Sequence, residues 1–244
     1  MTDAVSTPPA AAPAALRPEP QRTNWALVAL LWLSGVAAGL QFAKASVAFD
    51  ALAADYGASP TLAGWLLSTV GVVGVIFGAS AGLVVERIGF RRSLVLGLAA
   101  AALSAFETML PPVPLFLATR ALEGASHLAI IVAAPSCLVH AVAPGRRTVV
   151  ISLWGTFFSV AFLIAGALGL PLLAAFGLGG LFAAHEIVAA ALAFAAGLFI
   201  PADAPRPARA NRTERRSAIA AHVEVYADQR SAIPALCFLS STNP

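Results

Sequence analysis

The sequence has little charge and almost no cysteine. Asp, Glu, Lys and Arg make up 11% of its 244 residues, whereas about a quarter of a soluble domain is charged. This shortage argues against an ordinary soluble enzyme, a disordered chain and a basic nucleic-acid-binding surface. The two cysteines, Cys137 and Cys237, match no metal or redox spacing. We therefore expect no metal, no cofactor, no nucleic-acid partner and no set of catalytic residues.

Apolar residues are abundant instead, at 59% of the chain. They gather in runs of the length that a helix needs to cross about 30 Å of hydrocarbon. The runs do not alternate apolar and polar residues, as barrel strands would. The sequence therefore predicts an all-α membrane protein with six transmembrane helices, over Trp25 to Phe49, Pro60 to Val85, Ser93 to Leu110, Leu115 to Val142, Val149 to Phe176 and Gly180 to Ile200.

Arginines follow every second apolar run and are missing between the others. Because basic loops stay in the cytoplasm, this alternation predicts a multi-pass protein of the plasma membrane with both ends inside. We interpret residues 1–24 as a disordered cytoplasmic tail, 25–200 as the bundle, 201–231 as an Arg-rich cytoplasmic segment and 232–244 as the start of a seventh helix. The arginines are Arg17 and Arg22, then Arg87, Arg91 and Arg92, then Arg146 and Arg147, then Arg206, Arg209, Arg212, Arg215 and Arg216.

Two motifs in the chain resemble those of the major facilitator superfamily. The loop after the second run has the family's spacing of glycine, acid and basic residues, with Glu86 where the family usually has Asp. Arg120 and Gly124 in the fourth run are similar to a second family motif. The resemblance implies the N-terminal six-helix half of a transporter, a bundle of 3+3 repeats, and a loop that acts as the inner gate. The gating-loop residues would be Gly82, Glu86, Arg87, Gly89, Arg91 and Arg92.

Ionisable residues inside the apolar runs are candidate functional residues, because an unpaired charge in lipid costs several kcal/mol. On a helix, Arg120, Glu123 and His127 fall on one face. Lys44 and Gln41 lie at a similar depth in the first run. We expect these five residues to line a cavity and to serve substrate binding or ion coupling, although a permanent Arg120–Glu123 pair is the structural alternative.

Three further residues, Glu107, His185 and Glu186, lie in apolar runs that are peripheral in the resembled fold. We interpret them as boundary groups within reach of water. Glycines at four-residue spacing predict close packing between helices, since small residues let helices approach in lipid. The predicted packing residues are Gly71, Gly74, Gly78 and Gly124.

The resemblance implies secondary transport of a small solute by alternating access, with proton coupling as an open option. Lys44 and Arg120 favour an anionic solute. We expect the bilayer, in a bacterial inner membrane, and a second six-helix half or a homodimer as partners. Two alternatives remain: a rhomboid-like intramembrane serine protease using Ser126 and His185, and a membrane subunit or fragment that does not transport.

Overall fold

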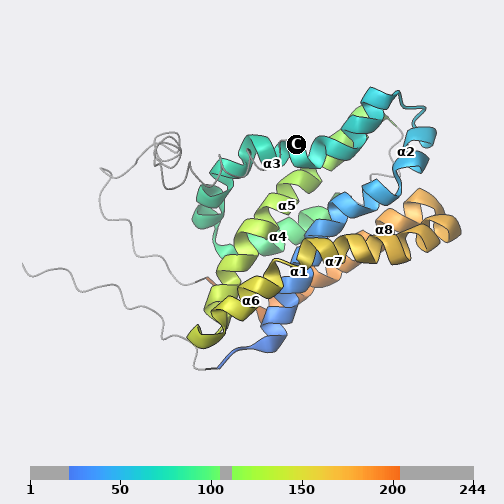
Figure 1. Cartoon of the computed structure of the whole chain (residues 1–244). Coiled ribbons are helices and arrows are strands. Elements are labelled where there is room, and N and C mark those ends of the chain that lie inside the picture. The colour runs from blue at the N-terminus through green and yellow to red at the C-terminus, as the bar shows by residue number, and fades with distance from the viewer. Residues whose placement is uncertain (1–21, 105–111, 204–244) are drawn as a thin grey trace, which may run out of the picture.

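The computed structural model describes residues 22–104 and 112–203, and those residues form helices and no strand (Figure 1). The tail before residue 22, the segment after residue 203 and Glu107 lie outside the described residues. The long helices are α1 (Trp25–Val47), α3 (Pro60–Ile88), α4 (Phe90–Leu103), α5 (Val113–Ala141) and α8 (Leu170–Phe199). The short ones are α2 (Phe49–Asp55), η2 (Pro144–Arg146), α6 (Arg147–Trp154), α7 (Phe157–Ile164) and the π-helical turn η3 (Ala165–Gly169).

Local sequence explains where several helices begin and end. The Asn24 side chain accepts a hydrogen bond from the backbone N–H of Leu27 at the start of α1, and Ser59 does the same for Leu62 at the start of α3. Both are N-caps that satisfy an otherwise unpaired donor. Gly89 separates α3 from α4 with a φ of 107°, a conformation that glycine tolerates and other residues rarely adopt.

Four stretches are long and apolar enough to cross a membrane: Trp25–Val47, Pro60–Gly78, Val113–Ala141 and Pro144–Phe199. The prediction of an all-helical membrane protein is therefore supported, while the count differs from the six runs expected. Two features of the described residues account for the difference. The described part of α4 has only 14 residues, and Pro144–Phe199 is one 56-residue stretch although Gly177 breaks its helical geometry with a φ of 66°.

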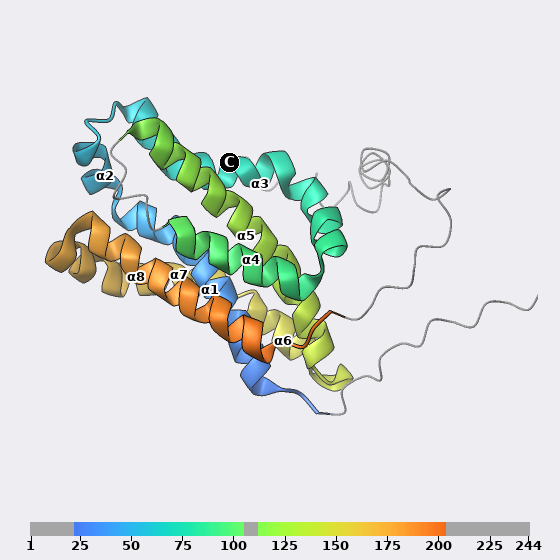
Figure 2. The same cartoon turned by 180° about the vertical axis from the view of Figure 1, so that it is seen from behind.

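The helices lie along one another as a bundle with two distinct ends. At one end, here called the Gly89 end, the N–H of Asn24 donates to the carbonyl of Ala141 over 3.1 Å. Asp203 contacts the start of α4 at this same end. The opposite end, called the α2 end, holds α2, the start of α5 and the bend at Gly177. Figure 2 shows α4 lying between α5 and α8.

Two apolar clusters fill the bundle, one toward each end. The cluster at the Gly89 end includes Leu31 of α1, Ile130 of α5 and Ala196 of α8. The cluster at the α2 end includes Phe116 of α5 and Phe182 of α8. Along each of these helices, buried polar residues occupy the positions between the two clusters. The bundle therefore encloses a polar layer between two apolar ones.

Candidate functional site

The polar layer contains a buried cluster of charged side chains from three helices. Lys44 of α1 lies between two carboxylates, with its Nζ 2.7 Å from Glu123 Oε1 of α5 and 3.2 Å from Glu186 Oε1 of α8. The exposed fractions of these three side chains are 2%, 0% and 3%. At such burial each charge needs a partner, because removing a charge from water is costly. The ion pairs therefore tie the three helices together.

Arg120 pairs with Glu123 from one turn away on the same helix. Its Nη1 also donates to the carbonyl oxygen of Gln41 in α1 over 3.0 Å. Arg120 is fully buried. Lys44 and Arg120 therefore both bind Glu123, and together with Glu186 they give two positive and two negative charges in the layer. The formal charges balance, as a buried ionic cluster requires.

A chain of neutral hydrogen bonds extends the layer to α4. The Gln41 amide donates to Ser126 Oγ over 2.8 Å, and Ser126 Oγ donates to the carbonyl of Gly97 over 2.7 Å. Ser104, the residue that follows α4, lies with its Oγ 3.4 Å from Glu123 Oε1. The polar layer therefore joins α1, α5 and α8 through ion pairs and side-chain hydrogen bonds, and reaches α4 through the carbonyl of Gly97.

The two histidines of the layer have different surroundings. His185 places Nε2 2.9 Å from the carbonyl oxygen of Ala37 and Nδ1 3.2 Å from Lys44 Nζ. A carbonyl only accepts, so Nε2 carries the proton and Nδ1 accepts from the ammonium group of Lys44. His127 is half-buried, contacts the carbonyl of Ala38 over 3.0 Å and packs edge-on against Phe42. Of the two, His185 belongs to the ionic cluster.

The structure brings four of the five predicted site residues into the cluster. Gln41, Lys44, Arg120 and Glu123 contact one another directly or through the backbone. His127 lies one turn further along α5. The predicted Arg120–Glu123 pair is present, but Lys44 shares the carboxylate of Glu123. Glu107 lies outside the described residues.

The interpretation of His185 and Glu186 as boundary groups within reach of water is wrong. Their exposed fractions are 5% and 3%, and both contact Lys44. The reason is the bend at Gly177, which begins the last helical segment early enough to place both residues about two turns inside it. The sequence offered one signal for a functional role of these two residues: an acid next to a histidine inside an apolar run. Ionisable residues within membrane-spanning segments mark functional positions.

Several buried atoms of the layer have no hydrogen-bond partner among the described residues: Gln41 Oε1, Arg120 Nε, Arg120 Nη2 and Glu186 Oε2. Each is a donor or acceptor for which burial without a partner costs free energy. The cluster therefore has spare hydrogen-bonding capacity on both its cationic and anionic groups.

The predicted gating loop is helical apart from Gly89. Gly82, Glu86 and Arg87 lie in α3, and Arg91 and Arg92 lie in the first turn of α4, all at the Gly89 end. Glu86, Arg87 and Arg92 are exposed. Arg91 is partly buried; its guanidinium donates to the carbonyl of Gly197 in α8, and its backbone N–H donates to Asp203 Oδ1 over 3.1 Å. Asp203 thus caps the start of α4, a favourable place for a carboxylate. Sequence reasoning missed Asp203, whose only signal is that it is the first acid after the last apolar run.

The predicted packing glycines differ in their surroundings. A methyl group at Gly124 would lie 2.7 Å from Val73 Cβ and 2.8 Å from the carbonyl of Val70, so α3 and α5 touch closely there. At Gly71 the nearest neighbour would be Phe42, at 3.7 Å. At Gly74, Gly78 and Gly82, nothing described lies within 4 Å. A packing role for Gly74 and Gly78 stays a prediction.

Ser126 and His185, the residues of the protease alternative, are held by other groups. Ser126 bonds to Gln41 and Gly97, while His185 bonds to Lys44 and Ala37. A serine nucleophile needs its base within hydrogen-bonding reach. The contacts of these two side chains do not support a catalytic pair.

The family model described as Major Facilitator Superfamily matches residues 31–242, which is most of the chain. The chain belongs to the Major Facilitator Superfamily. The match extends beyond residues 25–200, over which the sequence motifs carried the resemblance. Neither the curated proteins nor the solved structures gave a match to this chain.

Membership in the Major Facilitator Superfamily supports membrane transport as the general activity of this protein, because members of the family are generally transporters rather than enzymes. The apolar helices agree with a membrane location. For a Major Facilitator Superfamily protein, a buried ionic cluster that joins three helices is the natural candidate site, since charged groups within spanning helices mark solute and ion pathways.

Proposed function

We propose that this protein forms a six-helix half of a secondary transporter that moves a small solute by alternating access. The bend at Gly177 supports dividing Pro144–Phe199 into two crossings, and α4 supplies a further one. Together with the other three stretches they make six. Family membership supports the transport mechanism.

The observation that carries the proposal is Lys44 held between two carboxylates from different helices. In such a cluster, protonation of Glu123 or Glu186 weakens one ion pair and leaves Lys44 or Arg120 available to another anion. A solute carboxylate can then replace the lost partner. Proton binding and solute binding thereby favour the same rearrangement, which is the requirement for coupling.

An apolar surface on α3 supports the need for a second half. Val75, Ile76 and Phe77 are exposed, with Val75 at 87%. Gly74 and Gly78 lie beside them with open space around their Cα atoms. A contiguous apolar surface of this kind marks contact with lipid or with another protein. We propose that a second copy of the chain or a separate six-helix polypeptide covers part of it.

The charge distribution supports the orientation proposed from sequence. Arg87, Arg91, Arg92, Arg146 and Arg147 all lie at the Gly89 end, whereas α2 carries Asp50 and Asp55. The Gly89 end would therefore face the cytoplasm. We propose a bacterial inner membrane location with the N-terminus inside.

The mechanism predicts that Glu123 is needed for proton-coupled movement of an anion. The purified full chain is reconstituted into liposomes that enclose a pH-sensitive dye, and succinate, citrate or gluconate is added outside. We expect one or more of these anions to change the internal pH with wild-type protein. E123Q, which keeps the shape but not the titratable group, should slow this change at least about tenfold.

D50N is the matched control, because Asp50 is an exposed acid of α2 outside the polar layer. It should retain the wild-type rate. If E123Q retains that rate as well, Glu123 has no part in coupling. If wild-type protein gives no internal pH change with any of the three anions, proton-coupled anion transport by this chain, alone or as a homodimer, is rejected.

A further inference from the structure

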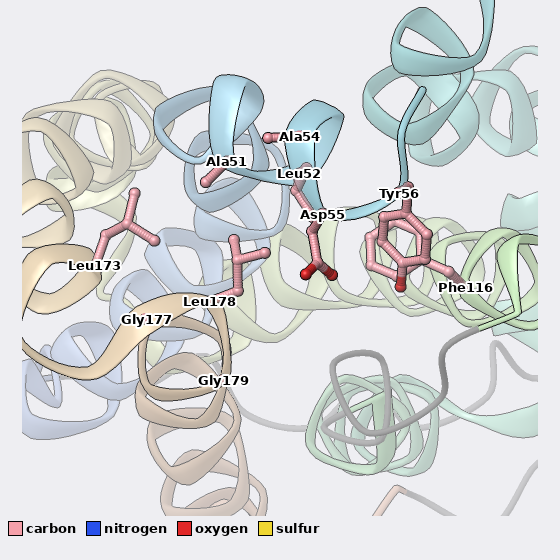
Figure 3. Close-up of a pocket in the computed structure, with 10 residues that line it drawn as sticks. All are labelled: Ala51, Leu52, Ala54, Asp55, Tyr56, Phe116, Leu173, Gly177, Leu178 and Gly179. Carbon is pink, nitrogen blue, oxygen red and sulfur yellow. The ribbon is translucent and has the colours of Figure 1, made fainter. Parts of the chain in front are cut away.

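A hollow of about 700 Å³ lies at the α2 end of the bundle, outside the polar layer. Its walls come from α2, from the start of α5 and from the bend in α8 (Figure 3). This volume lies within the range of pockets that hold small organic molecules. The wall residues that carry the argument are Leu52, Asp55, Tyr56, Phe116, Gly177 and Leu178.

The walls are apolar and aromatic with one charged group. Figure 3 shows the Asp55 carboxylate pointing into the space between Leu178 and the rings of Tyr56 and Phe116. The two ring centroids are 5.1 Å apart. A carboxylate attracts a cation, and aromatic faces add to that attraction. The lining therefore suits a molecule with a positive group and an apolar body.

Asp55 is the charged side chain that lines the hollow, and Asp50 lies on the same helix. The basic residues next to the wall segments, Lys44 and Arg120, lie in the polar layer and are paired with Glu123 and Glu186. Their positive charge is therefore compensated within the layer and does not cancel the negative charge of α2. A cation entering the hollow meets an attractive field.

Aromatic residues separate the hollow from the ionic cluster. Phe116 is fully buried, and its ring centroid lies 6.3 Å from that of Phe182, which is also fully buried. Lys44 Nζ lies 4.3 Å from the centre of the Phe182 ring on the far side. Phe116 borders the hollow, and Phe182 lies next to both Phe116 and Lys44. The hollow is therefore a site distinct from the polar layer.

We propose that this hollow binds a small organic ammonium ion that carries an apolar or aromatic group. Asp55 pairs with the ammonium group, and Tyr56 and Leu178 contact the apolar part. The site does not depend on the transport mechanism proposed above. An anionic solute would use Lys44 and Arg120, whereas this site selects the opposite charge.

The test compares phenethylammonium with 2-phenylethanol, which has a similar shape and no charge. Binding of each to the full chain in lipid nanodiscs is measured by titration calorimetry, with empty nanodiscs subtracted. We expect phenethylammonium to bind the wild type about fivefold more tightly than the alcohol, the scale of one partly exposed ion pair. D55N should remove this preference, and D55E should keep most of it.

D50N is the matched control, since it removes the same charge from α2 at a position that does not line the hollow. It should leave the preference unchanged. L178W should weaken binding of both compounds by filling the hollow without changing its charge. Equal affinities of the two compounds for the wild type would overturn the proposal, as would equal losses in D50N and D55N or unchanged binding in L178W.

Discussion

Lys44 shows how one buried residue can decide the arrangement of several helices. Its ammonium group contacts Glu123, Glu186 and His185 while the side chain is only 2% exposed. Such a buried ammonium group contributes to stability through its ion pairs with the carboxylates, because an unpaired buried charge would destabilise the protein. Removing one member of a buried ionic cluster leaves the others uncompensated, and that loss exceeds the net contribution of the intact pair.

Replacing Lys44 tests this dependence. K44M should destabilise the protein by about 3–5 kcal/mol, because it leaves Glu123 and Glu186 with one cation between them. The double variant K44M/E186Q should recover part of the loss, since it removes one of the unpaired carboxylates. Chemical unfolding in detergent micelles measures both changes.

E186Q alone is the third measurement of this double-mutant cycle and isolates the coupling between the two residues. Additive effects of K44M and E186Q would contradict the ion pair. Full stability of K44M would show that the cluster has no structural role.

At the scale of helices, glycines determine how closely the elements approach. Gly124 brings α5 against Val70 and Val73 of α3. Gly35 and Gly39 of α1 do the same toward Trp154 of α6 and Ala161 of α7, where an added methyl group would lie within 2.8 Å of a side-chain atom. The hydrogen bond from Trp32 Nε1 to the carbonyl of Leu153, at 3.0 Å, fixes α1 beside the break between α6 and α7.

The contrast between Gly124 and Gly78 gives a prediction at this scale. G124A should cost about 1–3 kcal/mol, because the new methyl group meets a backbone carbonyl that cannot move without separating α3 from α5. G78A adds the same methyl group where nothing described lies within 4 Å. It should be neutral or stabilise the helix by up to about 1 kcal/mol.

Unfolding of the two variants in detergent provides the comparison. Equal destabilisation by G124A and G78A would assign the effect to something other than the α3–α5 contact. A fully stable G124A would show that the two helices do not approach as closely as the structure places them.

At the scale of the whole molecule, the bundle has one acidic end and one basic end. The α2 end carries Asp50, Asp55 and the hollow, and the Gly89 end carries Arg87, Arg91, Arg92, Arg146 and Arg147. A membrane protein with this distribution is oriented by its basic residues. The two ends should therefore lie on opposite sides of the bilayer.

Single-cysteine labelling tests that orientation. Cysteine replaces Asp50 or Gly179 at the α2 end, and Arg92 or Gly145 at the other end, in a chain whose Cys137 and Cys237 are changed to serine. A membrane-impermeant maleimide added to intact cells should label the first two positions only, because the positively charged end is retained inside. Permeabilised cells should show all four labelled. Labelling of Arg92→Cys in intact cells would reverse the proposed topology.

Local pattern was sufficient for much of the fold. Asn24 and Ser59 cap helices where apolar runs begin, and Gly89 ends α3 where the motif suggested a turn. The polar positions of α5 were also predictable, because helical geometry alone places Arg120 and Glu123 within one turn. These features depend on neighbours a few residues apart, which the sequence displays directly.

The amino-acid sequence by itself determined a helical membrane protein with a few ionisable groups inside its apolar runs. Only the tertiary structure decided that Lys44 meets Glu186, 142 residues away, and that Asp203 caps α4 from beyond the last helix. The physical reason is that such contacts depend on the relative depth and rotation of whole helices. The bend at Gly177 and close packing between helices set both, and neither is encoded in the spacing of the charged residues.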